Sequence, residues 1–338
     1  MVRLGIVGCG NFGRDVHFAA LRALRRAEVE FEVTQLCDRD EARLALGAAI
    51  WPDARCCRSV QQMLHSGRPD GVMVLTPPGI TAGVGSFFLE RGIPCLLEKP
   101  PGNSVSEVAR LREAAAAGRT FAAVGFNRRH SAALKMALHF LRESGEGLER
   151  IDCRFLRAAR VDEEFSTTLI HAVDALSFLA GRAPEEMEVE YREIPHAVNI
   201  SAGLAFGGIT GHIDCRPACG VNQERYTLET AHCRIEADFP CQPGVAERVV
   251  VRRAGEPVRQ WTLPPHHPLR AEFYFQAGYY SEDKSFLHRL AAGGTPPRCE
   301  LPAAAEYSVA AMEAFRSRRS RLKFNVKEVE SGNEIPVG

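Results

Sequence analysis

The chain opens with Met1-Val-Arg-Leu-Gly-Ile-Val-Gly-Cys-Gly-Asn-Phe-Gly13, and this segment carries the strongest structural signal in the sequence. The apolar run Leu4–Val7 predicts a short strand, which leads directly into Gly-x-Gly-x-x-Gly, made by Gly8, Gly10 and Gly13. A helical pattern follows the last glycine. A strand, a glycine-rich turn and a helix in this order are typical of the first unit of a doubly wound α/β fold that binds a dinucleotide.

Each glycine has its own physical task in such a turn. Gly8 allows the tight turn out of the strand, Gly10 leaves room for a pyrophosphate beside the backbone, and Gly13 lets the helix pack close to the strand. The free N–H groups and the positive dipole end of the helix suit the phosphates. Asn11 and Phe12 complete this loop, and we expect them among the cofactor-binding residues.

A second signal stands at the end of the next predicted strand, Phe31–Cys37, where Asp38 follows directly. A carboxylate at this point accepts hydrogen bonds from the adenosine ribose hydroxyls, which favours NAD. Arg39 comes next and could instead hold a 2′-phosphate, so NADP stays possible. The plainer alternative is that both residues are only a polar strand end.

Strand and helix patterns alternate over residues 1–124, which predicts a parallel sheet with helices on both faces and a dinucleotide-binding Rossmann domain. Residues 125–338 read differently, because strand patterns follow one another with few helices between them. This second part predicts an α+β domain, for substrate binding and oligomerisation, with a large, mainly antiparallel open sheet. Helices near Ser166–Ala180, Tyr280–Ala292 and Pro302–Arg318 interrupt or close it, and the last two could pack back on the first domain. The tail from Arg319 is expected to be a solvated end.

Composition excludes several classes of protein. The chain has 338 residues, 45% of them hydrophobic and 25% charged, with a formal net charge of +0, so a folded core is expected and nucleic acid is not an expected partner. No apolar run is long enough for a bilayer, and no signal-peptide pattern precedes the first strand. The 11 cysteines are scattered without a C-x-x-C, which indicates a reducing cytoplasm and no disulfide framework. A zinc site at His212, Cys215 and Cys219 is conceivable, but a strand and a turn explain this segment better, so no metal is expected.

Four further motifs fall at predicted strand ends or on the second domain's helix: Thr76-Pro77, Glu98-Lys99-Pro100, Asn127-Arg128 and His171-Ala-Val-Asp174. With the glycine turn, in this order and spacing, the chain resembles the glucose–fructose oxidoreductase / inositol dehydrogenase (Gfo/Idh/MocA) family. The resemblance implies a Rossmann domain, a second domain with an open sheet, a nicotinamide cofactor, and a homodimer or homotetramer formed through that sheet.

The resemblance also implies roles for single residues. Lys99 is expected near the nicotinamide, where an ammonium of lowered pKa can assist proton transfer to the substrate oxygen. His171 is expected to act as general acid or base. Thr76, Pro77, Glu98 and Asn127 are expected on the nicotinamide side of the cofactor, and Arg128, Thr167 and Asp174 near the substrate. Without the motif set, a solvated Glu-Lys pair and a structural histidine would explain Lys99 and His171.

One departure stands out, because Thr167 occupies the position of an aspartate in the family's D-x-x-x-H pattern. A threonine hydroxyl can donate and accept hydrogen bonds, but it carries no negative charge that would stabilise an imidazolium. Glu163 or Glu164 could supply a carboxylate instead, or could serve only the start of the helix, where Ser166 is a plausible N-cap.

The expected function is therefore an NAD(P)-dependent oxidoreductase that moves a hydride between nicotinamide and a secondary alcohol or ketone of a sugar-like or cyclic polyol substrate. The departure at Thr167 keeps two alternatives open. One is a cofactor-binding sensor or regulatory protein without turnover. The other is a different chemistry on the same fold, such as an NAD-recycling glycosidase or eliminase, or an imine or enone reductase.

Overall fold

The computed structural model describes residues 1–160, 165–293 and 303–324, which form two compact units. The first unit contains Met1–Gly125 together with Tyr279–Val309, and the second contains Phe126–Gly278 together with the residues from Ala310. The two units are described separately below. In the described ranges, every helix is too short or too polar to cross a bilayer.

The first unit is built on a six-stranded sheet in which every pair of neighbouring strands is parallel. The strand order is β3-β2-β1-β4-β5-β6, the arrangement of a dinucleotide-binding Rossmann fold. The strands are β1 (Val2–Val7), β2 (Phe31–Cys37), β3 (Arg55–Cys57), β4 (Gly71–Val74), β5 (Cys95–Leu97) and β6 (Ala122–Val124). Their largely buried, apolar sequences explain why they lie inside a sheet covered on both faces.

Helices connect these strands, and several begin where the sequence supplies a capping side chain. Asp40 accepts hydrogen bonds from the first N–H groups of α2, and Ser59 and Ser104 do the same for α3 and α5. The helices are the π-helix η1 (Gly13–Phe18), α1 (Ala19–Arg26), α2 (Glu41–Ile50), α3 (Val60–His65), α4 (Pro78–Leu89), α5 (Val105–Ala117) and α9 (Tyr279–Ala292).

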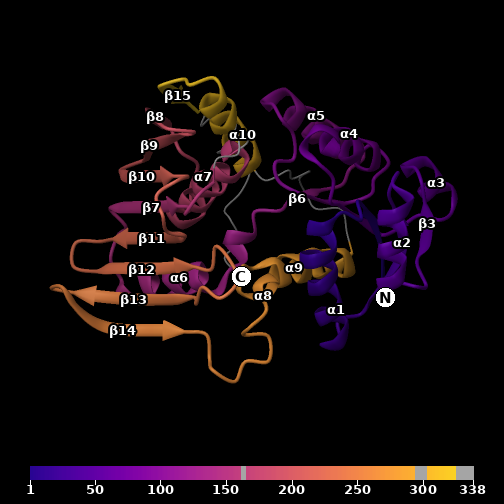
Figure 1. Cartoon of the computed structure of the whole chain (residues 1–338), viewed down its shortest axis with the longest axis horizontal. Coiled ribbons are helices and arrows are strands. Elements are labelled where there is room, and N and C mark those ends of the chain that lie inside the picture. Colours follow the sequence, from indigo (N-terminus) through magenta and orange to yellow (C-terminus); the bar gives the residue numbers. More distant parts are fainter. Residues whose placement is uncertain (161–164, 294–302, 325–338) are drawn as a thin grey trace. The chain divides into compact units, whose positions relative to one another are not determined.

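Helix α9 belongs to the first unit, although residues 126–278 of the second unit lie between β6 and α9 in the sequence. It packs beside α1, as Figure 1 also shows, and contacts β1. Phe286 and Leu287 of α9 are buried in the same apolar core cluster as Leu4 and Ile6 of β1. Burial of these side chains stabilises the Rossmann sheet from one face, at about 2 kcal/mol for each large apolar side chain.

The second unit contains a nine-stranded sheet in the order β14-β13-β12-β11-β7-β10-β9-β8-β15. All neighbouring strands are antiparallel except β7 and β10, so the sheet is mainly antiparallel as the sequence predicts. The strands are β7 (Arg150–Leu156), β8 (Glu186–Ile194), β9 (Ala197–Phe206), β10 (Ile209–Arg216), β11 (Gln223–Glu229), β12 (Arg234–Phe239), β13 (Arg248–Arg253), β14 (Glu256–Thr262) and β15 (Arg321–Lys323).

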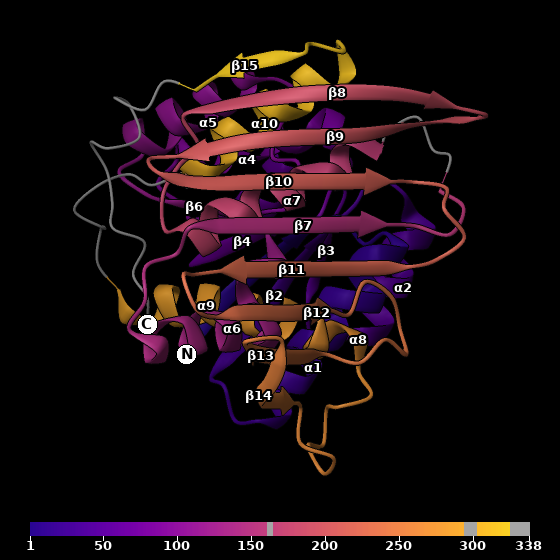
Figure 2. The same cartoon turned by 90° about the vertical axis from the view of Figure 1, so that its left-hand side faces the viewer.

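The two faces of this sheet differ. Helices α6 (Ala132–Ser144) and α7 (Ser166–Ala180) cover one face and contact β11–β13 and β7 with β10, respectively (Figure 1). On β7, Ile151, Cys153 and Phe155 are buried on this side, while the alternate residues point the other way. Figure 2 looks onto that other face, where the drawn strands lie in front of the helices. Short helices η2 (Asn127–His130) and α8 (Phe273–Gln276) and the longer α10 (Ala303–Arg316) complete the described elements.

Two local expectations are wrong. The part of the tail from Arg319 that the structure describes is not simply a solvated end, because Arg321–Lys323 form β15 and pair with Glu186–Glu188 of β8. Three residues are too few to show a strand period in the sequence. Residues 325–338 lie outside the described residues. Ser166 is the first residue of α7 rather than its cap, and Phe165, at the cap position, makes no side-chain capping hydrogen bond.

Candidate dinucleotide site

The glycine turn follows β1 at the point where the strand order of the first sheet reverses. β1 pairs with β2 on one side and with β4 on the other, and the chain after β4 runs beside the turn, where Leu75 N donates to Val7 O at 2.7 Å. In open α/β sheets, ligands bind outside the carboxyl ends of the strands at such a switch point. The geometry therefore places the turn where a dinucleotide is expected.

The three glycines differ in what surrounds them. Gly8 has φ +101°, and a Cβ there would lie 2.3 Å from Leu75 O. A Cβ on Gly13 would meet the Leu75 side chain at 3.3 Å, which reflects close packing of the helix on the strand. A Cβ on Gly10 would have no atom within 4 Å. Gly8 is thus required by the fold itself and Gly13 lies in close packing, whereas Gly10 keeps an open space that a pyrophosphate can use.

Asp38 binds the glycine turn directly. One carboxylate oxygen accepts a hydrogen bond from Cys9 N at 2.8 Å, and the other accepts one from Asp40 N at 3.0 Å. Each carboxylate oxygen has two lone pairs, so Asp38 can still accept from ribose hydroxyls. Arg39 is exposed beside it. The hydrogen bond from Cys9 N gives Asp38 a structural role that the sequence pattern did not reveal.

The other two loop residues have different surroundings. Asn11 is exposed, and its Oδ1 accepts from the Arg14 guanidinium at 2.8 Å, while the same guanidinium donates to Cys9 O at 3.0 Å. Arg14 therefore braces the loop from the first turn of the helix. Phe12 is 44% exposed, and its ring contacts that of Tyr279 in a T-shaped arrangement at a centroid distance of 5.7 Å.

Thr76 and Pro77 shape the loop after β4. Thr76 is buried, and its hydroxyl lies 2.9 Å from that of Thr81 on α4. Pro77 stands immediately before α4, whose first residue is Pro78. These contacts explain the rigid end of β4, while cofactor contact by Thr76 and Pro77 stays a prediction.

Glu98 and Lys99 follow β5 in the same sheet. Glu98 N donates to Val74 O at 2.9 Å, which holds this strand end beside the end of β4. Both side chains are half-buried. A Cβ on Gly125 would lie 3.2 Å from Glu98 Oε2, so the glycine after β6 leaves room for this carboxylate.

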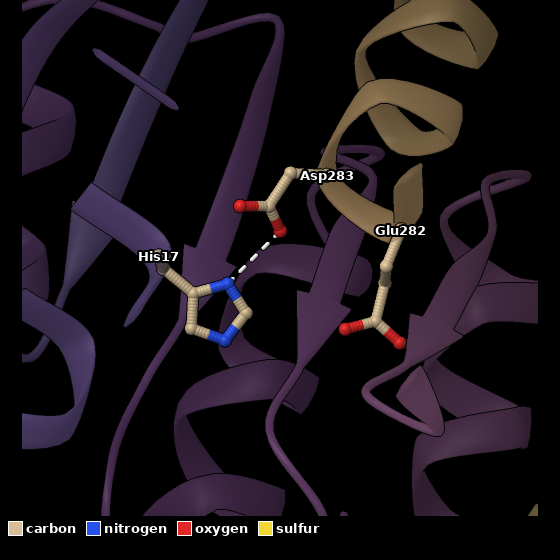
Figure 3. A group of neighbouring side chains, drawn as sticks. All are labelled: His17, Glu282 and Asp283. Atoms are coloured by element: carbon tan, nitrogen blue, oxygen red, sulfur yellow. Dashed lines mark hydrogen bonds and ion pairs between the residues drawn. The ribbon is translucent and has the colours of Figure 1, made fainter. Parts of the chain in front are cut away.

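A buried group of charged side chains beside this strand end was missed by sequence reasoning. His17 of η1 is 1% exposed, and its Nδ1 lies 2.9 Å from Asp283 Oδ1 of α9 (Figure 3). Its Nε2 lies 3.4 Å from Glu98 Oε2. His17 follows the glycine turn closely, which is a usable hint, but its partner lies 266 positions further along the chain and no local pattern links the two.

The protonation of His17 follows from these contacts. Burial alone lowers the pKa of His17, but the charge and hydrogen bond of Asp283, reinforced by Glu98, raise it well above its usual value. The raised pKa favours the protonated ring, which donates from Nδ1 to Asp283 and faces Glu98 with Nε2 at an ion-pair distance of 3.4 Å. One ligand atom from each of His17, Asp283 and Glu282 lies within 4.8 Å of the others. Both His17 nitrogens face carboxylates, Nδ1 that of Asp283 and Nε2 that of Glu98.

Two of the predicted site residues, Asn127 and Arg128, are buried and bonded to other residues of the second unit. Asn127 is 1% exposed, donates to Ala277 O at 2.8 Å and accepts from Arg128 at 3.0 Å. Arg128 forms a buried two-point ion pair with Glu224, at 3.0 and 3.1 Å. These contacts give both residues structural tasks, and their contact with cofactor or substrate stays a prediction.

The helix α7 carries three further predicted residues. His171 is 2% exposed and its ring contacts Phe126 at a centroid distance of 6.0 Å. Thr167 lies one turn before His171 and is half-buried. Asp174 is fully buried and receives three hydrogen bonds of 2.6–3.0 Å from Arg129. Glu163 and Glu164 lie outside the described residues.

The conceivable zinc site at the end of β10 has the geometry of a strand and a turn. His212 Nε2 lies 2.9 Å from Ser201 Oγ of the neighbouring strand β9. Cys215 is buried in β10, whereas Cys219 is exposed in the following turn and donates to Arg157 O. These three side chains are thus used in separate contacts.

Comparison with known proteins agrees with this geometry. Residues 2–126 match the family model GFO_IDH_MocA, described as "Oxidoreductase family, NAD-binding Rossmann fold". Among curated proteins, inositol 2-dehydrogenase of Corynebacterium glutamicum (strain R) is 27% identical over 198 residues. That match covers 56% of this chain and 57% of the relative, so the chain spans little more than half the length of the curated relatives it matches.

Solved structures show the same fold over nearly the whole chain. A Gfo/Idh/MocA family oxidoreductase from Vibrio cholerae superposes with a TM-score of 0.76 at 20% identity, covering 94% of this chain and 98% of that one. GenD2 from gentamicin A biosynthesis, solved in complex with NAD, superposes with a TM-score of 0.75 at 22% identity, covering 96% of both chains. Residues 2–126 therefore resemble the NAD-binding Rossmann domain of the Gfo/Idh/MocA oxidoreductase family, and the solved structures show the same fold over nearly the whole chain.

Proposed function

We propose that this protein is an NAD-dependent dehydrogenase that moves a hydride between nicotinamide and a secondary alcohol or ketone of a sugar-like or cyclic polyol substrate. The observation that carries the proposal is the pairing of two features in one sheet. The first is a glycine turn with open space at Gly10, and the second is the Glu98–Lys99 strand end at the same carboxyl edge. Residues 1–124 would bind the cofactor, and residues 125–338 would bind substrate.

The chain's own residues divide the cofactor among them. The turn from Gly8 to Gly13, including Asn11 and Phe12, would hold the pyrophosphate, and Asp38 the ribose hydroxyls. The carboxylate of Asp38 disfavours a 2′-phosphate, although Arg39 beside it keeps NADP possible. NAD, when bound, accepts or donates the hydride.

Lys99 and His171 are the residues we assign to proton transfer. Oxidation of an alcohol releases a proton from its hydroxyl, and a lysine amine or a neutral imidazole can accept it. Thr76, Pro77, Glu98 and Asn127 would bind on the nicotinamide side, and Arg128, Thr167 and Asp174 would act near the substrate. The polyol class rests on the inositol 2-dehydrogenase relatives.

We also propose a homodimer or homotetramer formed through the open face of the nine-stranded sheet. Charged side chains line this face in pairs across neighbouring strands, such as Arg154 with Asp214 and Arg225 with Asp238. A self-complementary surface of this kind suits a symmetric contact between two copies.

The test begins with fluorescence titration of the purified protein with NADH and NADPH, followed by a panel of cyclic polyols and sugars monitored by NADH absorbance. We expect turnover with at least one polyol, a loss of about 100-fold or more in Lys99→Ala, and little change in Lys323→Ala, a lysine on β15. A wild-type protein that binds neither nucleotide, or a Lys99→Ala variant with full turnover, contradicts the proposal.

The position of Thr167 favours one alternative, a cofactor-binding sensor without turnover. The half-buried threonine one turn before His171 cannot stabilise a positive charge on the imidazole as an aspartate would. Tight NADH binding with no turnover on any substrate of the panel would support this alternative.

A further inference from the structure

We propose that His17 and Asp283 are positioning residues that hold Glu98, and through it Lys99, at the carboxyl end of β5. The inference deepens the proposed function and rests on it. His17 lies in the π-helical turn directly after the glycine turn, Glu98 lies at the end of β5, and Asp283 lies on α9. A single imidazole therefore links three separate elements of the first unit.

The geometry gives each nitrogen of His17 a separate task. Nδ1 donates to Asp283 Oδ1 at 2.9 Å, which fixes the orientation of the ring. Nε2 then points at Glu98 Oε2, 3.4 Å away. Tyr279 and Phe12 contact the same ring at centroid distances of 5.5 and 5.9 Å, which restricts its movement further.

Burial makes this arrangement sensitive to single charges. His17 is 1% exposed and Asp283 is fully buried, so neither charge is solvated by bulk water. A buried ion pair adds little net stability, but removal of one partner leaves an uncompensated charge. Such a cluster is better explained by a need to hold Glu98 in one place than by stability alone.

Lys99 is adjacent to Glu98 in the chain, so a shift of the Glu98 carboxylate changes the charged surroundings of Lys99 at this strand end. The backbone of Glu98 is tied to Val74 O, and Gly125 provides the space for its side chain. His17 adds an ion-pair contact of 3.4 Å to the carboxylate itself. A displacement of about 1 Å at a reacting group can cost about 100-fold in rate.

The variant Asp283→Asn tests this chain of contacts without touching Lys99. The asparagine Oδ1 can still accept from His17 Nδ1, but the imidazole loses the charge that kept it doubly protonated. A neutral ring has one N–H: with the proton on Nδ1 it presents a bare Nε2 that repels Glu98, and with the proton on Nε2 it accepts from the asparagine N–H and offers Glu98 only an uncharged donor. In either form the attraction between a charged imidazolium and the Glu98 carboxylate is lost. We expect Glu98 to leave its position while the fold and the glycine turn remain.

Three measurements follow for wild type, Asp283→Asn and the matched control Glu306→Gln, which removes the charge that pairs with Arg112 elsewhere in the first unit. In ¹⁵N NMR of the histidine side chains, assigned with His17→Gln, we expect both His17 nitrogens to be protonated near pH 8 in wild type and in the control only. We expect kcat to fall by about 10-fold to 100-fold in Asp283→Asn, while NADH affinity changes by less than about 3-fold.

The third measurement is independent of turnover. The rate at which pyridoxal phosphate and borohydride label Lys99 is compared by peptide mass spectrometry with the rate at Lys323. We expect a change of about 3-fold or more at Lys99 in Asp283→Asn and none at Lys323, because the reactivity of an amine follows its surroundings. A structural role alone would lower the melting temperature without changing this ratio.

Several outcomes overturn the inference. They are a neutral His17 in wild type, an unchanged Lys99 labelling ratio in Asp283→Asn, or an unchanged kcat in that variant of an active enzyme. A stoichiometric metal ion that is present in wild type and lost in Asp283→Asn also overturns it, because His17, Glu282 and Asp283 would then be ligands. If wild type shows no turnover, the proposed function fails, and the NMR and labelling results still decide the roles of His17 and Asp283.

Discussion

At the scale of single residues, Gly8 and Gly10 are expected to respond differently to replacement by alanine. The change at Gly8 affects stability, and the change at Gly10 affects cofactor binding. We expect Gly8→Ala to lower stability by about 2 kcal/mol or more, because of its positive φ and the 2.3 Å approach of a Cβ to Leu75 O. We expect Gly10→Ala to keep the melting temperature within about 2 °C and to weaken NADH binding by about 10-fold.

Thermal denaturation and NADH titration of both variants separate these effects. If Gly10→Ala binds NADH as wild type does, the pyrophosphate does not lie beside this residue. If Gly8→Ala is as stable as wild type, the strain deduced from the backbone angle is absent.

Thr167 supports a second prediction at this scale. We expect Thr167→Asp to raise kcat by about 10-fold in an active enzyme, because a carboxylate one turn from His171 stabilises the imidazolium formed when the ring accepts a proton. Thr167→Asn has nearly the same shape without the charge and serves as the control. If kcat rises equally in both variants, or in neither, a negative charge at position 167 does not stabilise the imidazolium of His171.

At the scale of elements, a buried acid with an unusual pKa lies against the start of α6. Glu247 lies just before β13, is 2% exposed, and accepts from Ala133 N of α6 at 3.2 Å. Burial raises its pKa from 4.5 to about 7, against the opposing effect of the helix N–H groups. The folded chain therefore holds a proton here that the unfolded chain has already released between these two pH values.

The sign of the pH dependence follows from this difference. Stability falls as pH rises from about 4.5 to about 7, and the full cost above this range is roughly 3 kcal/mol. We expect Glu247→Gln to match wild type near pH 4.5 and to melt at a higher temperature near pH 8. Glu143→Gln, on the exposed side of α6, should show no such pH-dependent gain, and an equal gain in both variants would contradict the assignment to Glu247.

At the scale of the whole molecule, the open face of the nine-stranded sheet leads to a prediction about assembly. A substitution in a symmetric interface acts twice, once in each copy. We expect Arg154→Glu on β7 to shift a dimer or tetramer towards smaller species by about 10-fold or more in dissociation constant. Light scattering coupled to size-exclusion chromatography measures this shift.

The control is Arg22→Glu on α1 of the first unit, which is equally a charge reversal at an exposed position. A monomeric wild type, or equal effects of both substitutions, would remove the sheet face as the interface.

The amino-acid sequence by itself determined the Rossmann order, the strand-rich second part and the resemblance of the first part to the Gfo/Idh/MocA family. These features rest on local signals: the glycine turn, buried apolar runs and capping residues such as Asp40 and Ser104 act on the chain next to them. Only the tertiary structure decided that α9 joins the first unit, that Arg321–Lys323 complete the edge of the second sheet, and that His17 lies between Glu98 and Asp283. The physical reason is that these contacts depend on burial and charge between segments far apart in the chain, and no local period or spacing records them.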